Sequence, residues 1–119
     1  MNQISYFCKI KSITLKNISA TVLKQKIDSN ESLCLLDIRE DYEREISYIP
    51  SMHIPMGEIV KKIHELPKDK EIVVICRSGK RAIPVAHLLE NDFHFPNISI
   101  LDGGLLAWRE KVDPNFDLE

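Results

Sequence analysis

Residues 71–75 read Glu-Ile-Val-Val-Ile, a run in which apolar residues are continuous and do not alternate with polar ones. A strand with this pattern is covered on both faces, as are the parallel strands of α/β proteins. The stretch from Ala82 to Glu90 has the periodicity of a helix, and only a short turn separates it from the apolar run. The sequence therefore predicts a βα unit built on a parallel sheet.

Strand and helix patterns alternate along the rest of the chain. Ser19 is a favourable N-cap for a helix that extends to about Ser29. This alternation predicts an α/β fold, with a largely parallel five-stranded sheet and helices on both faces. The other expected elements are an edge strand within residues 5–15, strands at 33–36, 52–54 and 98–101, and helices at 41–46, 58–66 and 105–111.

The length of the chain predicts a single domain. A chain of 119 residues buries roughly two thirds of its unfolded surface in one core and is short for two domains. We expect the domain to span residues 13–112. Residues 1–12 are expected to form an N-terminal extension that contributes to the edge strand, and residues 113–119 a C-terminal tail.

The composition argues against several kinds of partner. A net charge of −2 and an isoelectric point near 6.1 provide no overall basic field, so no nucleic-acid partner is expected. No stretch reaches the length of a membrane-spanning helix, and Met1-Asn2-Gln3 lacks the basic start and apolar run of a secretion signal. We therefore expect a cytoplasmic protein with no membrane partner.

The three cysteines, at positions 8, 34 and 76, form an odd set without a Cys-x-x-Cys pair. This pattern argues against a disulfide scaffold, a zinc site and a thioredoxin-like redox motif, so neither a metal nor a cofactor is expected. Cys34 lies between leucines and is interpreted as a small apolar core residue, and Cys8 as an idle thiol. Cys76 is the remaining candidate for chemistry.

Cys76 follows the apolar run and opens the turn Cys76-Arg-Ser-Gly-Lys-Arg81. The backbone N–H groups of such a turn, the start of the next helix and the charges of Arg77, Lys80 and Arg81 all favour an anion at the sulfur. A buried, inert cysteine before a Ser-Gly turn is the alternative interpretation. Three cations within five residues favour a reactive thiolate, because a structural turn does not require concentrated positive charge.

The spacing within the turn separates two cysteine chemistries. Four residues lie between Cys76 and Arg81, whereas cysteine-dependent phosphatases place the arginine one residue later, where this chain has Ala82. The shorter turn, between a strand and a helix, resembles the active-site loop of the rhodanese sulfurtransferase family. Other segments resemble further signatures of that family in the same order: Leu35-Leu-Asp-Ile-Arg-Glu40 with Tyr42-Glu43, Ile49-Pro50 with Ile54-Pro-Met-Gly-Glu58, and Leu101-Asp-Gly-Gly-Leu105 with Ala107-Trp108.

The resemblance implies a rhodanese-like fold and an enzyme that moves sulfane sulfur through a persulfide on Cys76. It implies a small anionic donor, such as thiosulfate or a persulfide, and a thiol or cyanide as acceptor. Asp37 and Arg39 are expected to form an orienting ion pair that supports the loop. The expected substrate-binding residues are the five that follow the cysteine: Arg77, Ser78, Gly79, Lys80 and Arg81.

Two alternatives stay open. The closing segment, followed by Val112-Asp-Pro114, resembles rhodanese domains fused behind adenylyltransferases that pass sulfur to small carrier proteins. A sulfur relay or binding module that delivers sulfur to a protein carrier is therefore the first alternative. A cysteine-dependent phosphatase is the second, and the length of the loop disfavours it.

Overall fold

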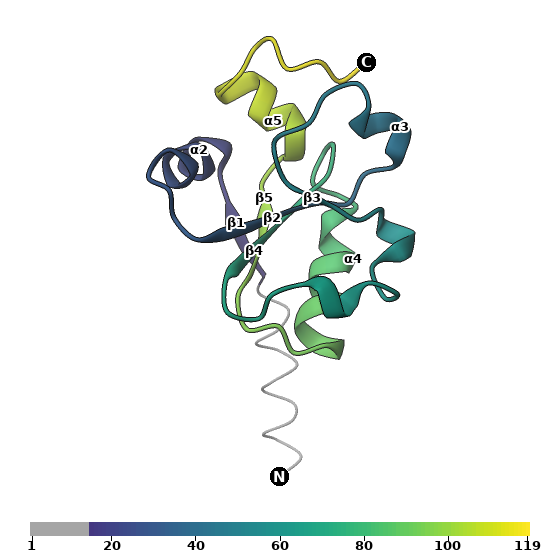
Figure 1. Ribbon diagram of the computed structural model, residues 1–119. Coiled ribbons are helices and arrows are strands. Elements are labelled where there is room, and N and C mark those ends of the chain that lie inside the picture. Colours follow the sequence, from purple (N-terminus) through teal and green to yellow (C-terminus); the bar gives the residue numbers. More distant parts are fainter. Residues whose placement is uncertain (1–14) are drawn as a thin grey trace.

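The computed structural model describes residues 15–119, which contain a five-stranded sheet in the order β1-β5-β4-β2-β3 (Figure 1). Every pair of neighbouring strands is parallel, and β4 lies in the centre. The predicted α/β fold with a parallel five-stranded sheet is confirmed. The strands are β1 (Lys16–Ile18), β2 (Leu33–Asp37), β3 (Met52–His53), β4 (Glu71–Ile75) and β5 (Ile98–Leu101).

Helices cover both faces of the sheet, as the sequence predicted. One face packs against α2 and α5, and the other against α4 and the connection between β3 and β4. No helix within residues 15–119 is long and apolar enough to cross a bilayer. The helices and helical turns are α2 (Ala20–Asp28), α3 (Asp41–Arg44), η1 (Met56–Glu58), η2 (Ile63–Glu65), α4 (Ala82–His87), η3 (Leu88–Asp92) and α5 (Gly104–Lys111).

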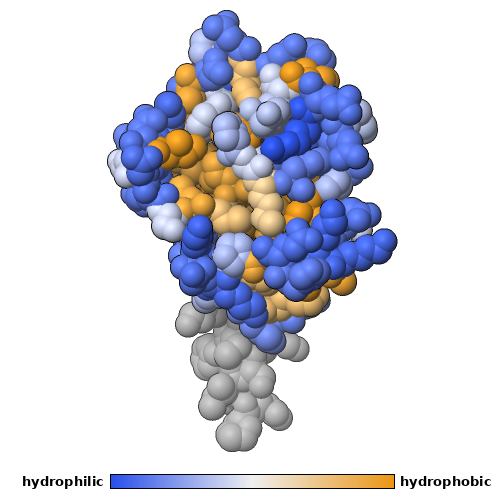
Figure 2. Space-filling model, in the orientation of Figure 1, coloured by the Kyte–Doolittle hydropathy of each residue, from blue (hydrophilic) through white to orange (hydrophobic). Residues whose placement is uncertain are grey.

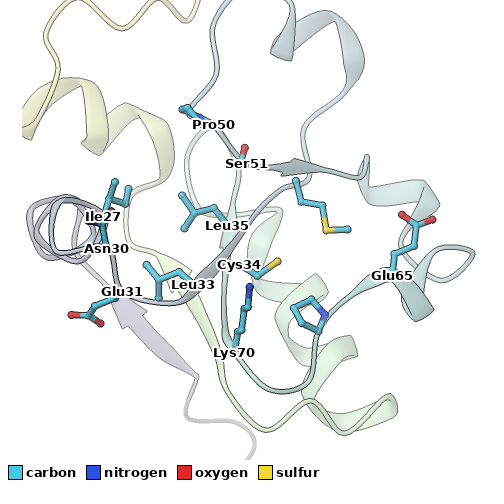
Figure 3. Close-up of a pocket in the computed structure, with 12 residues that line it drawn as sticks. Ile27, Asn30, Glu31, Leu33, Cys34, Leu35, Pro50, Ser51, Glu65 and Lys70 are labelled. Carbon is cyan, nitrogen blue, oxygen red and sulfur yellow. The ribbon is translucent and has the colours of Figure 1, made fainter.

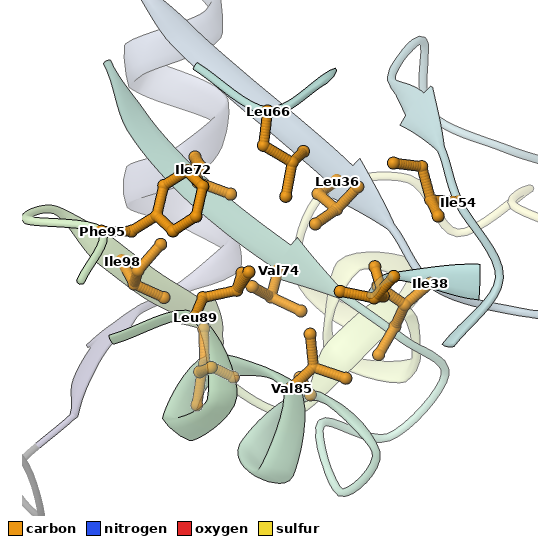
Figure 4. Packing of buried hydrophobic residues seen from close by; sticks show 14 of the residues in the cluster. Leu36, Ile38, Ile54, Leu66, Ile72, Val74, Val85, Leu89, Phe95 and Ile98 are labelled. Carbon is orange, nitrogen blue, oxygen red and sulfur yellow. The ribbon is translucent and has the colours of Figure 1, made fainter. Parts of the chain in front are cut away.

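The central strand β4 is apolar throughout because both of its faces are covered. Successive side chains of a strand point to opposite faces of the sheet. Ile72 and Val74 pack on the α4 side, in the same cluster as Leu89 (Figure 4). Val73 and Ile75 belong to the opposite cluster, which includes side chains of α2 and α5. The strand therefore joins two apolar cores and ends directly at the predicted catalytic turn.

The predicted helix over residues 58–66 is wrong. Residues 56–66 instead form the two 3-10 turns η1 and η2, and residues 59–62 between them form further turns. A typical bond there spans three residues, from the N–H of Leu66 to the carbonyl of Ile63 at 3.2 Å. The β-branched side chains of Ile59, Val60 and Ile63 disfavour a regular helix. Burial of Ile59 and Leu66 in the core therefore decides the path of the backbone.

The edge strand that the structure describes, β1, begins just after the range predicted for it. β1 begins at Lys16 and pairs with β5, whereas Leu15 is not in a strand and residues 5–14 lie outside the described residues. Only Ile18 of β1 is buried, so its apolar pattern is too short to place a strand. The predicted extension over residues 1–12, with the thiol of Cys8, also lies outside the described residues.

The C-terminal tail packs onto the domain. Phe116 and Leu118 are 7% and 6% exposed and belong to the same apolar cluster as α2 and α5. The N–H of Asp113 donates to the carbonyl of Trp108 at 3.0 Å, which turns the chain back after α5. The domain limit at residue 112 stays a prediction, but the tail shares the core of the preceding residues.

Candidate active site

The structure places Cys76 directly after β4, at the edge of the sheet where the parallel strands end. Cys76 is 1% exposed, and its Sγ accepts a hydrogen bond from the N–H of Gly79 at 3.1 Å. Gly79 has φ of +96°, a backbone conformation that L side chains rarely adopt. This turn of the backbone directs an amide N–H at the sulfur, an arrangement typical of anion-binding turns.

Backbone hydrogen bonds join the start of α5 to the loop that begins at Cys76. The N–H groups of Leu105 and Leu106 donate to the carbonyls of Cys76 and Arg77, each at 2.9 Å. Gly104 makes this close approach possible, because a Cβ atom there would lie 2.5 Å from the same two carbonyl oxygens. The Gly-Gly pair of the closing segment therefore has a direct structural role beside the cysteine.

Arg81, at the end of the loop, is bound by a carboxylate of α3. Its Nη1 and Nη2 atoms donate to the two carboxylate oxygens of Glu43, each at 2.8 Å. This hydrogen bonding lowers the pKa of Glu43 to about 2 and raises the pKa of Arg81. Glu43 also accepts a hydrogen bond from the N–H of Glu40 at 3.0 Å, which fixes its position in the first turn of α3. The ion pair therefore ties α3 to the candidate loop.

Asp37 and Arg39, which the sequence suggested as a pair that supports the loop, form a buried ion pair. Nη2 of Arg39 lies 2.9 Å from Oδ2 of Asp37, and both side chains are 2% exposed. Arg39 also donates to the carbonyl of Ser47 at 2.8 Å, and Arg44 donates to Asp37 at 3.1 Å. These contacts hold the segment between β2 and β3, which carries α3 and therefore Glu43.

The other loop cations have different surroundings. Nη1 of Arg77 donates to the carbonyl of Leu118 at 2.8 Å, and Nη2 lies 3.5 Å from a carboxylate oxygen of Glu119. Lys80 is exposed and makes no ion pair among residues 15–119, while its N–H lies 3.4 Å from Oγ of Ser78. Two of the three predicted substrate-binding cations thus have carboxylate partners within the chain.

Sequence reasoning missed the roles of Glu43, Arg44 and the tail. Glu40 and Glu43 have the spacing of a capping box, which could have indicated the start of α3. No local pattern indicates the pairing of Glu43 with Arg81, because 38 positions separate them. The tail contact with Arg77 spans 41 positions and has no sequence signal either.

A groove of about 620 Å³ lies away from this site, along the first half of β2 (Figure 3). Leu33, Cys34 and Leu35 line it, together with Lys70. Apolar residues gather on this face in the space-filling view (Figure 2). Burial raises the pKa of the Cys34 thiol, which keeps it neutral and poorly nucleophilic. The half-buried Cys34 packs against the apolar cluster on the α4 side, in keeping with a structural role.

Known proteins are similar to this chain over most of its length. The family model of the rhodanese-like domain matches residues 19–111. The presumed sulfurtransferase YtwF of Bacillus subtilis is 43% identical over 101 residues, covering 84% of this chain and 96% of YtwF. The presumed sulfur carrier protein YrkF of the same organism is 38% identical over 101 residues, covering 84% of this chain and 54% of YrkF. The crystal structure of a rhodanese-related protein from Thermoplasma volcanium, 31% identical, matches with a TM-score of 0.72 and covers 87% of this chain and 99% of that one. This chain belongs to the rhodanese-like domain family.

Proposed function

We propose that the protein is a sulfurtransferase that carries sulfane sulfur on Cys76 as a persulfide. The observation that carries the proposal is the hydrogen bond from the N–H of Gly79 to the buried Sγ of Cys76, at 3.1 Å. An amide aimed at sulfur stabilises both the thiolate and the terminal sulfur of a persulfide. The likeness to YtwF supports sulfur transfer as the general activity.

The proposed reaction has two steps. The thiolate of Cys76 attacks the outer sulfur of thiosulfate, the sulfur–sulfur bond of the donor breaks, and sulfite leaves with the electron pair. Cys76 then carries a persulfide anion. In the second step a thiolate or cyanide attacks the terminal sulfur, and the Cys76 thiolate departs in its original state. Atoms and charge balance in each step without an external oxidant or reductant.

The loop has two tasks in this proposal. Its backbone N–H groups hold the anionic sulfur, and Gly79 supplies the one that the geometry places at hydrogen-bonding distance. Lys80 and the guanidinium of Arg77 attract the anionic donor and the leaving sulfite. Glu43 offsets the charge of Arg81 and holds its guanidinium in place, so the main task of Arg81 is to fix the end of the loop.

A protein acceptor is the second candidate. The presumed sulfur carrier YrkF contains a segment 38% identical to this chain, which supports transfer to a protein thiol or thiocarboxylate. Phosphatase chemistry has less support. Ala82 occupies the position where the phosphatase loop requires its arginine, and this residue is fully buried at the start of α4.

Mass spectrometry after brief exposure to thiosulfate tests the proposal. We expect the peptide that contains Cys76 to gain one sulfur atom, and cyanide to remove it while forming thiocyanate. Cys76→Ser should abolish turnover with the fold intact, whereas the matched Cys34→Ser variant should retain it. Sulfur on Cys34 or Cys8 alone, or full turnover by Cys76→Ser, would refute the assignment.

A further inference from the structure

The C-terminal tail, residues 113–119, reaches the candidate site although it lies outside the family match, which ends at residue 111. In Figure 1 the tail turns back at the end of α5 and ends on the side of the molecule that carries α3. One of its contacts with the loop is the hydrogen bond from Arg77 to the carbonyl of Leu118, at 2.8 Å. The tail is therefore a feature of this chain beyond the matched family domain.

Apolar burial fixes the position of the tail independently of its charges. Phe116 and Leu118 are both buried in the cluster that contains Trp108 of α5. Burying two large apolar side chains supplies several times the free energy of an exposed ion pair. The carboxylate of Glu119, the next residue, is thus held close to the loop even though the carboxylate itself is exposed.

Glu119 lies between two arginines. One of its carboxylate oxygens is 3.5 Å from Nη2 of Arg77, and the other is 3.4 Å from Nη1 of Arg109. An anion that approaches Arg77 therefore meets a guanidinium whose charge a carboxylate already offsets. Because Coulomb energy scales with the product of the charges, this carboxylate opposes a dianion about twice as strongly as a monoanion.

We propose that Glu119 is a specificity-determining residue of the site, which lowers the attraction of the loop for dianionic donors more than for donors of lower charge. The proposal rests on the proposed function, since it concerns the donor that Cys76 attacks. Glu119 is 71% exposed, so water and salt screen its effect, and the expected changes are limited to about two- to threefold. The tail thereby tunes which anionic sulfur compound the site accepts.

Alkylation of Cys76 tests this charge effect without requiring sulfur transfer. Iodoacetate and iodoacetamide both alkylate a thiolate with loss of iodide, but only the first carries a negative charge. For Glu119→Gln, we expect the ratio of the iodoacetate rate to the iodoacetamide rate on the Cys76 peptide to rise about twofold at low salt. Added salt should remove the rise. Glu110→Gln is the matched control, because it removes the same charge from a side chain of similar exposure, 76%. The cation that Glu110 contacts, at 4.0 Å, is Lys111 and not an arginine of the loop.

Turnover provides the second measurement. Methanethiosulfonate offers the same outer sulfur as thiosulfate with one negative charge fewer. Glu119→Gln should lower KM for thiosulfate about threefold and KM for methanethiosulfonate by less, with kcat unchanged. An alkylation ratio that stays constant or falls in Glu119→Gln, or that rises equally in Glu110→Gln, would overturn the proposal. Absence of sulfur on Cys76 would instead contradict the proposed function, and the alkylation ratio would still decide the role of Glu119.

Discussion

At the scale of single residues, Gly104 sets how closely α5 approaches the loop that begins at Cys76. It has φ of +62°, and an added Cβ would lie 2.5 Å from the carbonyl oxygens of Cys76 and Arg77. Gly104→Ala should therefore reduce the free energy of unfolding by about 3 kcal/mol, through backbone strain and the displaced loop. We also expect sulfur transfer to slow about tenfold or more, because small displacements of reacting groups are costly. Urea unfolding and turnover measure the two effects.

Gly57 provides the matched control for this substitution. A Cβ at this position would meet no atom within 4 Å. Gly57→Ala should change the free energy of unfolding by less than about 0.5 kcal/mol and leave turnover unchanged. Equal stability and turnover in Gly104→Ala and Gly57→Ala would show that α5 does not support the loop through this contact.

The sequence predicted the position of Cys76 but not the role of Gly104. A continuous apolar strand followed by a cationic turn is a local pattern, and it placed the thiol at the end of the strand correctly. The contact of Gly104 with the carbonyl of Cys76 joins segments that are distant along the chain. Without the structure, Gly103-Gly104 is only a turn signal, because the backbone that approaches it is unknown.

At the scale of secondary-structure elements, the pairing of Glu43 with Arg81 joins α3 to the loop. The pKa of Glu43 is lowered from 4.5 to about 2, chiefly by its hydrogen bonds with Arg81. A carboxyl group whose pKa is lower in the folded than in the unfolded protein stabilises the folded state at any pH above its unfolded-state pKa. This contribution disappears as the pH falls from about 5 to about 2. The shift corresponds to a contribution on the order of 3 kcal/mol at pH 7.

Glu43→Gln should therefore reduce the free energy of unfolding by about 2 to 3 kcal/mol at pH 7, and the difference from the unchanged protein should close towards pH 2. Urea unfolding across this pH range provides the measurement. Glu45→Gln, an exposed carboxylate at the end of α3, is the control and should have little effect at any pH. A deficit in Glu43→Gln that is the same at pH 2.5 and pH 7 would contradict the ion-pair account.

Most elements with local signals were predicted well, but the segment over residues 58–66 was not. Ser19 caps α2 as predicted, with Oγ accepting the N–H of Val22 at 3.1 Å. The spacing of Ile59, Ile63 and Leu66 fits a helix, but the segment forms 3-10 turns instead. Tertiary packing overrides a weak local preference for helix. The pairing of α3 with the loop had no local signal, because ion pairs between distant segments leave no periodic pattern in one sequence.

At the scale of the whole molecule, two apolar cores share one sheet. β4 contributes alternate side chains to each core, so neither core keeps its packing surface if the strand detaches. Leu89 lies in the core on the α4 side, whereas Trp108, the single tryptophan, lies in the opposite core. A shared central strand predicts that the two cores unfold together.

Leu89→Ala tests this coupling, because it creates a cavity on the face away from the fluorescent reporter. The substitution should reduce the free energy of unfolding by about 3 kcal/mol, since Leu89 is fully buried. If unfolding is a single transition, Trp108 fluorescence and far-ultraviolet circular dichroism should shift to the same lower urea midpoint, although the cavity lies across the sheet from the tryptophan. Val60→Ala, at a side chain that is 58% exposed, should leave the midpoint in place. A Trp108 transition that keeps its original midpoint while circular dichroism shifts would show that each face unfolds separately, and that the loop at the end of β4 is supported by one core alone.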